Sequence, residues 1–159
     1  AELGEAIAKL KGDLDTARQE VLYARAETQN VRRRLEKDVA DARSYAATGF
    51  ARDILSVADN LVRALDSIPE ELREDEKFKG LVAGIEATQR ELERVFSQHG
   101  ATRVAAKGLP LDPNVHEAVM EIPSDDADPG TVIQEMQAGY LIKDRLLRPA
   151  MVGVAKKPD

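Results

Sequence analysis

The sequence contains no cysteine and no tryptophan, and aromatic residues make up only 4% of its 159 positions. Without cysteine there is no disulfide framework, no thiol nucleophile and no thiolate metal site. The low aromatic content, together with 33% charged residues, is more typical of long solvated helices than of a large globular core. The absence of cysteine also fits a reducing compartment, so we expect a cytoplasmic protein.

Long apolar runs and an excess of basic charge are missing too. No stretch approaches the roughly 20 apolar residues that span a membrane, and no signal peptide is recognisable, so neither insertion nor secretion is expected. The formal net charge is −6, whereas general nucleic-acid binders usually carry a strong positive excess. We therefore expect no nucleic-acid partner and no membrane partner.

Proline is absent before Pro69, and this part of the chain follows the pattern of one long helix. Apolar side chains recur in alternating steps of four and three, with Thr28 as the weak position. Such a repeat keeps one stripe of a helix facing a partner helix, as in a coiled coil. We expect a near-continuous helix from Glu2 to Asp66, with a kink or break at Gly49, paired in a homodimer. The seam consists of Leu3, Ile7, Leu10, Leu14, Ala17, Val21, Ala24, Thr28, Val31 and Leu35.

The repeat changes after Val31, where most steps become four. The next apolar positions are Leu35, Val39, Ala42, Ala46 and Phe50. This spacing is closer to an eleven-residue repeat and predicts two nearly straight helices side by side. Alanine side chains bury little apolar area, so the pairing here is weak. We expect this half of the chain to melt early.

After Phe50 the apolar face becomes wide enough to pack against more than one helix. An acidic connection leads into a second helix, predicted from Glu76 to His99, which Gly100 ends as a C-cap. Two helices joined by a short loop pack antiparallel, and a dimer of such pairs forms a four-helix bundle. The residues that we expect to pack in this dimerisation bundle are Ile54, Val57, Leu61, Leu65, Leu81, Ile85 and Leu92.

After Gly100, proline and glycine become frequent and the apolar period falls to two, which predicts short strands. The expected strands are Thr102–Ala105, His116–Ile122, Thr131–Gln137 and Leu146–Ala155. Pro149 lies inside the last of these and favours an edge position or a bulge. The predicted fold class is therefore α+β. Its three regions are a long paired helix over 1–49, a helical dimerisation bundle over 50–100 and a small β domain over 101–159.

No motif points to catalysis, so we expect no enzyme, no cofactor, no metal and no small-molecule substrate. His99 and His116 do not have the spacing of metal ligands. The acidic residues Asp125, Asp126 and Asp128 lack the ligand order of a calcium-binding loop. No glycine-rich phosphate-binding motif is present.

A basic cluster on the long helix is open to two interpretations. Arg32, Arg33 and Arg34 form either a solvated helical face, balanced by acidic neighbours such as Glu36, or a site for an acidic protein surface. A DNA-reading helix would need more basic residues with a zipper after them, whereas this seam lies mostly before the cluster. The net charge also opposes a DNA-binding function.

Four segments of the chain resemble the GrpE family, in the family's order. In the helical half these segments are 27–34 (ETQNVRRR) and 50–61 (FARDILSVADNL), and in the β half 110–118 (PLDPNVHEA) and 139–155 (GYLIKDRLLRPAMVGVA). The last two together are highly specific. The resemblance implies a nucleotide exchange factor for DnaK-type chaperones, built as a parallel homodimer. One β domain would contact the chaperone's ATPase domain and open its cleft, so that ADP leaves, and the long helices would act as a thermosensor.

Residue roles follow from the same resemblance. Gly84 matches a family glycine that helix packing requires, so it joins the dimerisation residues. Leu111 and Met136 are equally open to an interpretation as β-domain core. Asp41 stands where many relatives carry a basic residue, which argues against an ionic contact there. The implied chaperone contacts are Arg32, Arg33, Arg63, Asp66, Leu111, Met136 and, more weakly, Val154.

A structural coiled-coil scaffold without exchange activity is the alternative function. That hypothesis accounts for the helices but gives the β domain and its signature segments no role. The exchange-factor hypothesis accounts for both.

Overall fold

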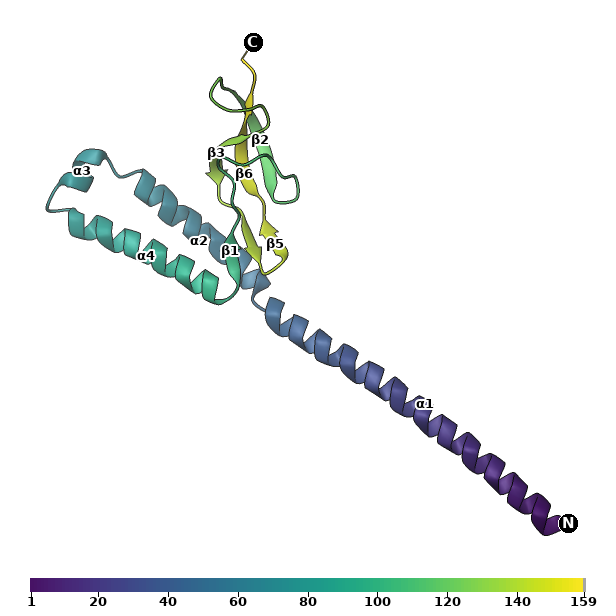
Figure 1. Ribbon diagram of the computed structural model, residues 1–159. Helices are drawn as coiled ribbons and strands as arrows, with labels where there is room; N and C mark the ends of the chain where they lie inside the picture. The colour runs from purple at the N-terminus through teal and green to yellow at the C-terminus, as the bar shows by residue number, and fades with distance from the viewer. Residues whose placement is uncertain (159) are drawn as a thin grey trace. The chain divides into compact units, whose positions relative to one another are not determined.

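The computed structural model describes residues 1–158, and the chain divides into two compact units, residues 1–46 and the residues from 47 onward. The first unit is helix α1, Glu2–Tyr45. The second contains three further helices and six strands (Figure 1). This arrangement confirms the predicted α+β fold class. Within residues 1–158, no helix combines the length and the apolar character needed to cross a lipid bilayer.

The long helical pattern is interrupted earlier than predicted. Helix α1 ends at Tyr45 and α2 spans Thr48–Asp66, so the break falls at the two alanines between them and Gly49 is already helical. No residue of α1 is buried, whereas burial in α2 begins at Ala51. The break therefore coincides with the onset of tertiary packing, which outweighs the local flexibility of a glycine.

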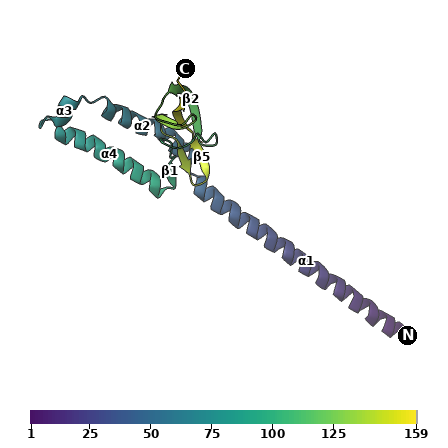
Figure 2. The same ribbon diagram turned by 45° about the horizontal axis from the view of Figure 1, so that its top comes forward.

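Helices α2 and α4 (Lys79–Gln98) form an antiparallel hairpin, seen side by side in both views of the ribbon (Figure 2). The buried residues of α2 recur at helical spacing, as expected for one face of an amphipathic helix. We call α2, α3 and α4 together the helical hairpin. The buried residues of its two long helices are Ala51, Leu55, Ala58 and Leu65 on α2 and Val82 and Phe96 on α4.

The connection between the two long helices contains a short helix, α3 (Glu70–Glu74), that was not predicted. The Arg73 side chain donates hydrogen bonds to the carbonyl oxygens of Leu65 and Ile68 and so satisfies acceptors at the end of α2. Helix α4 begins three residues later than predicted. The Asp75 carboxylate accepts a hydrogen bond from the Lys77 backbone N–H at 2.9 Å, and this local bond favours a turn over a helix.

Gly100 ends the second long helix, as predicted. It follows the cap residue His99 and has a φ of +78°, a left-handed conformation that glycine adopts without a Cβ penalty. Strand β1 begins at the next residue.

Two three-stranded sheets make up the β domain, which we define as the residues from 101 onward. The first sheet has the order β1-β4-β5 and is antiparallel. The second has the order β2-β6-β3, with β6 parallel to β2 and antiparallel to β3. The strands are β1 (Ala101–Arg103), β2 (His116–Pro123), β3 (Val132–Gln137), β4 (Tyr140–Ile142), β5 (Arg145–Arg148) and β6 (Ala150–Lys156).

The prediction of one strand over Leu146–Ala155 was wrong, because the chain forms β5 and β6 there and changes sheet at Pro149. Proline has no N–H to donate, so the ladder cannot continue through it. Strand β4 was missed because its three residues are all apolar and show no alternation. The other three predicted strands match β1, β2 and β3 to within a few residues.

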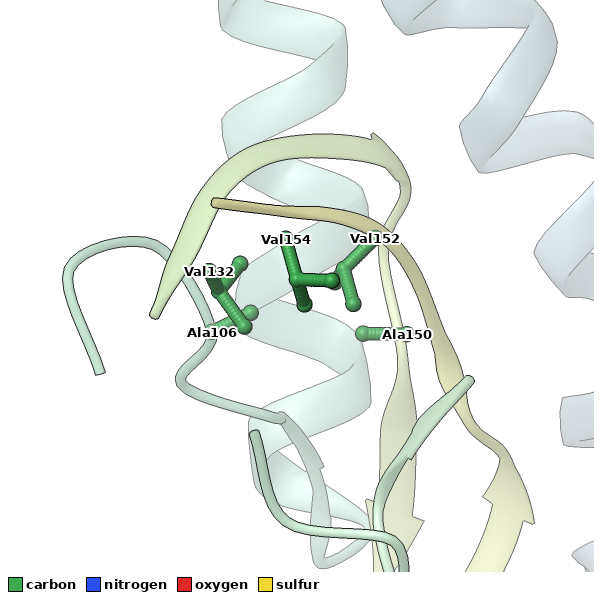
Figure 3. Packing of buried hydrophobic residues seen from close by; sticks show 5 residues of the cluster. All are labelled: Ala106, Val132, Ala150, Val152 and Val154. Atoms are coloured by element: carbon green, nitrogen blue, oxygen red, sulfur yellow. The ribbon is translucent and has the colours of Figure 1, made fainter. Parts of the chain in front are cut away.

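Buried side chains of the second sheet form the core of the β domain. Val132, Val152 and Ala150 are completely buried, and their side chains point toward one another together with those of Ala106 and Val154 (Figure 3). These small aliphatic residues fill the narrow space beside the sheet without polar atoms. The core therefore fixes the position of β6, the central strand of this sheet.

Gly139 lies just before β4, where two backbone segments approach closely. A Cβ at this position would lie 2.3 Å from the backbone nitrogen of Ala150 and 2.8 Å from the carbonyl carbon of Pro149. Backbone atoms cannot move aside as the tip of a flexible side chain can. Only glycine fits here, so this residue allows the first sheet to join the start of β6.

Substituting Gly139→Ala should therefore destabilise the β domain by about 1–3 kcal/mol or more, the usual cost of overpacking. Amide hydrogen exchange would measure this as lost protection in β6. Gly80→Ala on α4 is the matched control, because a Cβ there has no neighbour within 4 Å. That substitution should be neutral or stabilising by up to about 1 kcal/mol. Unchanged protection of β6 in Gly139→Ala would contradict the steric argument.

Candidate functional site

Three of the predicted contact residues line one cavity between the hairpin and the β domain. Arg63 and Asp66 come from α2, and Met136 comes from β3. The cavity has a volume of about 270 Å³ and also contains side chains of both charge signs from α4 and β1, namely Glu93 and Arg103. The structure thus brings together residues that lie about 70 positions apart in the sequence. An amphipathic cavity with several charged groups suits a protein surface better than an apolar ligand.

Leu111 and Val154 lie on another part of the β domain. Leu111 is partly buried and packs against the core cluster, and Val154 is a member of that cluster. The interpretation of Leu111 as a packing residue is therefore confirmed, while a contact role for it stays a prediction. Val154 is 7% exposed, so its side chain packs in the core beneath the surface of the β domain.

Arg32 and Arg33 belong to α1, in the other compact unit. Both side chains are exposed. The Arg32 guanidinium lies 3.0 Å from a Glu36 carboxylate oxygen one helical turn later. Exposed pairs of this kind contribute little to stability, so Arg32 can exchange Glu36 for another partner at low energetic cost.

A bidentate ion pair joins the hairpin to the β domain. Both terminal nitrogens of Arg148 donate to the two Asp59 carboxylate oxygens, each at 2.6 Å. Both side chains are only 17% exposed. Gln137 donates a further hydrogen bond to the same carboxylate at 3.0 Å, and the Arg148 Nε donates to the Ala138 carbonyl oxygen at 2.8 Å. Fork geometry makes this pair more directional than an exposed one, and partial burial makes the loss of one partner costly because the other charge is left unpaired.

Aromatic packing adds to the same junction. The rings of Phe96 on α4 and Tyr140 on β4 lie 5.7 Å apart and are tilted by 52°. The Arg148 guanidinium lies 5.8 Å from the centre of the Tyr140 ring, within the range of a cation–π contact. Burial raises the pKa of the Tyr140 phenol above its ordinary value of 10.0, because the phenolate would lose hydration there.

His116 is a buried structural residue, as expected from its isolation in the sequence. Its Nδ1 accepts a hydrogen bond from the Asp112 backbone N–H at 3.0 Å, which assigns the ring proton to Nε2. The Nε2 lies 2.7 Å from the Ala105 carbonyl oxygen and donates to it. These two bonds hold together the ends of the segment that carries Leu111. Within residues 1–158, no group of three or more acidic or histidine side chains is arranged to hold a metal ion.

The predicted dimerisation residues divide between two faces of the hairpin. Leu65 is buried inside it, and Ile54, Leu61, Ile85 and Leu92 are partly buried. Val57 is 47% exposed and Leu81 is 62% exposed, although both are large apolar residues. Gly84 is exposed, and a Cβ there would have no neighbour within 4 Å. Nothing within the single chain therefore requires a glycine at this position.

An outward apolar face runs along both long helices of the hairpin, beside the face that packs inside it. Its positions alternate in steps of three and four on each helix, as in a helical seam. We call this set of residues the outer seam. It consists of Phe50, Ile54, Val57, Leu61, Ala64 and Ile68 on or just after α2 and Phe78, Leu81, Ile85, Thr88, Leu92 and Val95 on or just before α4.

Sequence reasoning missed Asp59, Gln137 and Arg148. Asp59 and Arg148 are separated by 89 positions, so no local spacing links them. The available signals were weak. Asp59 lies one helical turn before Arg63, and Arg148 lies directly before a proline.

Comparison with known proteins identifies the class to which this architecture belongs. The family model described as GrpE matches residues 1–156, which is nearly the whole chain. The chain therefore belongs to the GrpE family of co-chaperones.

Individual relatives agree with this assignment. The chain is 74% identical over 158 residues to Protein GrpE of Erythrobacter litoralis, covering 99% of this chain and 80% of the relative. It is 77% identical over 153 residues to Protein GrpE of Novosphingobium aromaticivorans, covering 96% of this chain and 82% of the relative. It is 66% identical over 159 residues to Protein GrpE of Rhizorhabdus wittichii, covering 100% of this chain and 88% of the relative.

Removing either partner of the Asp59–Arg148 pair should lower the free energy of unfolding of the unit from residue 47 onward. Asp59→Ala and Arg148→Ala should each cost about 2–4 kcal/mol, because the remaining charge is left largely buried and unpaired. A double-mutant cycle from urea denaturation should show a coupling of about 1–3 kcal/mol.

The exposed Glu91–Arg94 pair on α4 is the control for that cycle, since both of its side chains are more than half exposed. Its coupling should be far smaller because solvent screens exposed charges. Equal couplings for the two pairs would show that Asp59–Arg148 contributes no more than an exposed ion pair.

Proposed function

We propose that this chain is a nucleotide exchange factor that binds the ATPase domain of a DnaK-type chaperone and accelerates ADP release. The observation that carries the proposal is the match of the GrpE family model to residues 1–156. The cavity that gathers Arg63, Asp66 and Met136 supplies a surface of suitable character. The factor itself makes and breaks no covalent bond in this function, and it needs no cofactor.

The contact surface combines charged groups from the hairpin with apolar groups from the β domain. Arg63 and Asp66 offer charges of opposite sign one turn apart on α2, which favours one orientation of a partner. Met136 is 38% exposed, and its flexible thioether side chain adapts well to a partner's surface. Leu111 extends the apolar contact over the segment held by His116, and Val154 supports that region from the core. Arg32 and Arg33 of α1 add positive charge.

The exchange mechanism follows from thermodynamic linkage. A partner that binds the open nucleotide cleft better than the closed, ADP-filled cleft must weaken ADP binding by the same factor. Binding energy from the surface around Met136 is then used to stabilise the open chaperone. No catalytic group is required for this effect.

The functional unit in this proposal is a parallel homodimer. The outer seam leaves large residues such as Val57 and Leu81 in contact with water. The seam of α1 does the same, and no residue of α1 is buried. A second copy that covers both seams would form a four-helix bundle from two hairpins and a coiled coil from two α1 helices. Gly84 flanks the outer seam, where a small residue lets the partner helix approach closely.

We also propose that α1 acts as a thermosensor. A helix that buries nothing within its own chain depends on its partner helix for stability. Ala42 and Ala46 lie where the seam is thinnest, so the paired α1 helices should loosen at a lower temperature than the bundle. Loosening would disturb the basic residues Arg32 and Arg33 and slow exchange on heating.

We propose a cytoplasmic protein without nucleic-acid, membrane or small-molecule partners of its own. A coiled-coil scaffold without exchange activity would need the same helices. It would leave the charged cavity at the junction without a role, so the exchange function is preferred.

Stopped-flow release of a fluorescent ADP analogue from a DnaK-type ATPase domain tests the exchange function. The wild-type protein should accelerate release, and Met136→Glu with Leu111→Glu should abolish most of the acceleration, because a carboxylate placed in an apolar contact loses its hydration. Leu22→Glu on α1 is the control, since Leu22 is exposed and lies off the predicted seam. If the wild type accelerates release and the double variant does so equally, Met136 and Leu111 do not contact the chaperone. An absence of acceleration by the wild type would leave the scaffold as the function.

Calorimetry and circular dichroism at several protein concentrations test the dimer and the thermosensor together. We expect two transitions, the lower from α1, and both midpoints should rise with concentration because association stabilises the folded state. Leu81→Asp should lower the upper midpoint, whereas Ala87→Asp on the solvent side of α4 should not. A single transition would rule out the thermosensor, and midpoints independent of concentration would rule out the dimer.

A further inference from the structure

The β domain is attached to the hairpin on two sides. On the α4 side the attachment is covalent, through Gly100, and Phe96 packs on Tyr140. On the α2 side it includes the Asp59–Arg148 ion pair and a hydrogen bond of 3.3 Å from the Arg52 Nε to the Leu147 carbonyl oxygen. A body held on one side alone can pivot, whereas attachments to two helices define an orientation. The polar bonds on the α2 side are therefore needed, together with the α4 attachment, to define the orientation of the β domain.

The ion pair also holds the segment that follows Met136. Gln137 donates to the Asp59 carboxylate, and the Ala138 carbonyl oxygen accepts from Arg148. The two residues after Met136 are thus bonded to the two members of the pair. The place of the Met136 side chain relative to α2 is set by the same charges that join the domains.

Asp59 itself lies on the face of α2 that carries the charged contact residues. Asp59, Arg63 and Asp66 are spaced four and then three residues apart, so they share one face of the helix. All three line the cavity together with Met136. The pair therefore stands at one end of the surface and connects its α2 part to its β3 part.

From this geometry we infer that Asp59 and Arg148 are positioning residues for chaperone binding, which keep Met136 facing Arg63 and Asp66 as one surface. The inference rests on the proposed exchange function. Without the pair, each half of the surface stays intact, but the two halves share the binding orientation for only part of the time. The concentration needed for binding then rises in proportion to the lost fraction, while the bound complex stays the same.

This role leaves a kinetic signature that differs from general destabilisation. If the binding orientation is populated about one tenth of the time, the half-saturating concentration rises about tenfold. The rate of ADP release at saturation stays unchanged, because binding restores the orientation. A misfolded fraction would instead lower the effective concentration in proportion to the folded protein that is lost, and circular dichroism would detect that loss.

Asp59→Asn and Arg148→Lys are the test variants, because both keep the size of the side chain nearly unchanged and weaken the bidentate pair. Stopped-flow ADP release would be measured over a range of concentrations of the full chain. Glu91→Gln on α4 is the matched control, since it removes an exposed ion pair that does not reach the β domain. We expect a rise of about tenfold in the half-saturating concentration for the two test variants and no change for the control.

Orientation is measured separately by distances between spin labels. The chain has no cysteine, so Ala87→Cys on α4 and Glu121→Cys on β2 create two unique labelling sites on exposed positions. Labelled chain mixed with an excess of unlabelled chain reports distances within one copy. We expect a narrow distance distribution with the native pair and a broader one in Asp59→Asn and Arg148→Lys.

The outcomes separate this inference from the proposed function. Acceleration by the wild type, combined with unchanged half-saturation or a reduced rate at saturation in the variants, would overturn the positioning role alone. An unchanged, narrow distance distribution would overturn it as well. No acceleration by the wild type would overturn the exchange function, and the positioning role in chaperone binding would fall with it.

Discussion

The ion pair between Asp59 and Arg148 joins the hairpin to the β domain on the α2 side, opposite the covalent connection from α4. The hairpin and the β domain each have a core of their own, the first built from helix faces and the second from small aliphatic residues around β6. Apolar packing is not directional, so it tolerates small rotations at a junction. A bidentate pair of charges, with Gln137 and the Ala138 carbonyl bonded to its members, is directional. The ion pair therefore adds directional order to the aromatic packing at the junction.

The apolar residues of the helical part divide between two destinations. One face of each long helix packs inside the hairpin, while the outer seam is exposed or only partly buried and no residue of α1 is buried in the single chain. Burying a large aliphatic side chain gives about 1.5–3 kcal/mol, so a set of this size left in water is a considerable loss for a monomer. The proposed homodimer recovers it. In that assembly the fold of one copy and the association of two copies are parts of one equilibrium.

Periodic patterns predicted the helices well, because a helix repeats its environment every turn and α2 and α4 do so over several turns. The same reasoning placed the break at Gly49, but the break lies at Ala46 and Ala47, one turn before burial begins at Ala51. It also missed β4, whose three residues are all apolar and show no alternation, and it joined β5 to β6 across Pro149. Periodic patterns could not predict the junction. Asp59 and Arg148 are charged residues in separate elements, and only the folded backbone brings them together.

A stiff junction matters for nucleotide exchange because of what linkage demands of a binding partner. The partner must distinguish the open cleft from the closed one, since equal affinity for both would shift nothing. A surface whose two halves move independently must first be brought into the binding orientation, and this ordering raises the concentration needed to bind the open cleft. A surface already held in that orientation binds the open cleft without this loss. In the proposed mechanism, the Asp59–Arg148 junction thus sets the concentration at which the factor stabilises the open chaperone, while the contacts made in the complex set how strongly the open cleft is favoured over the closed one.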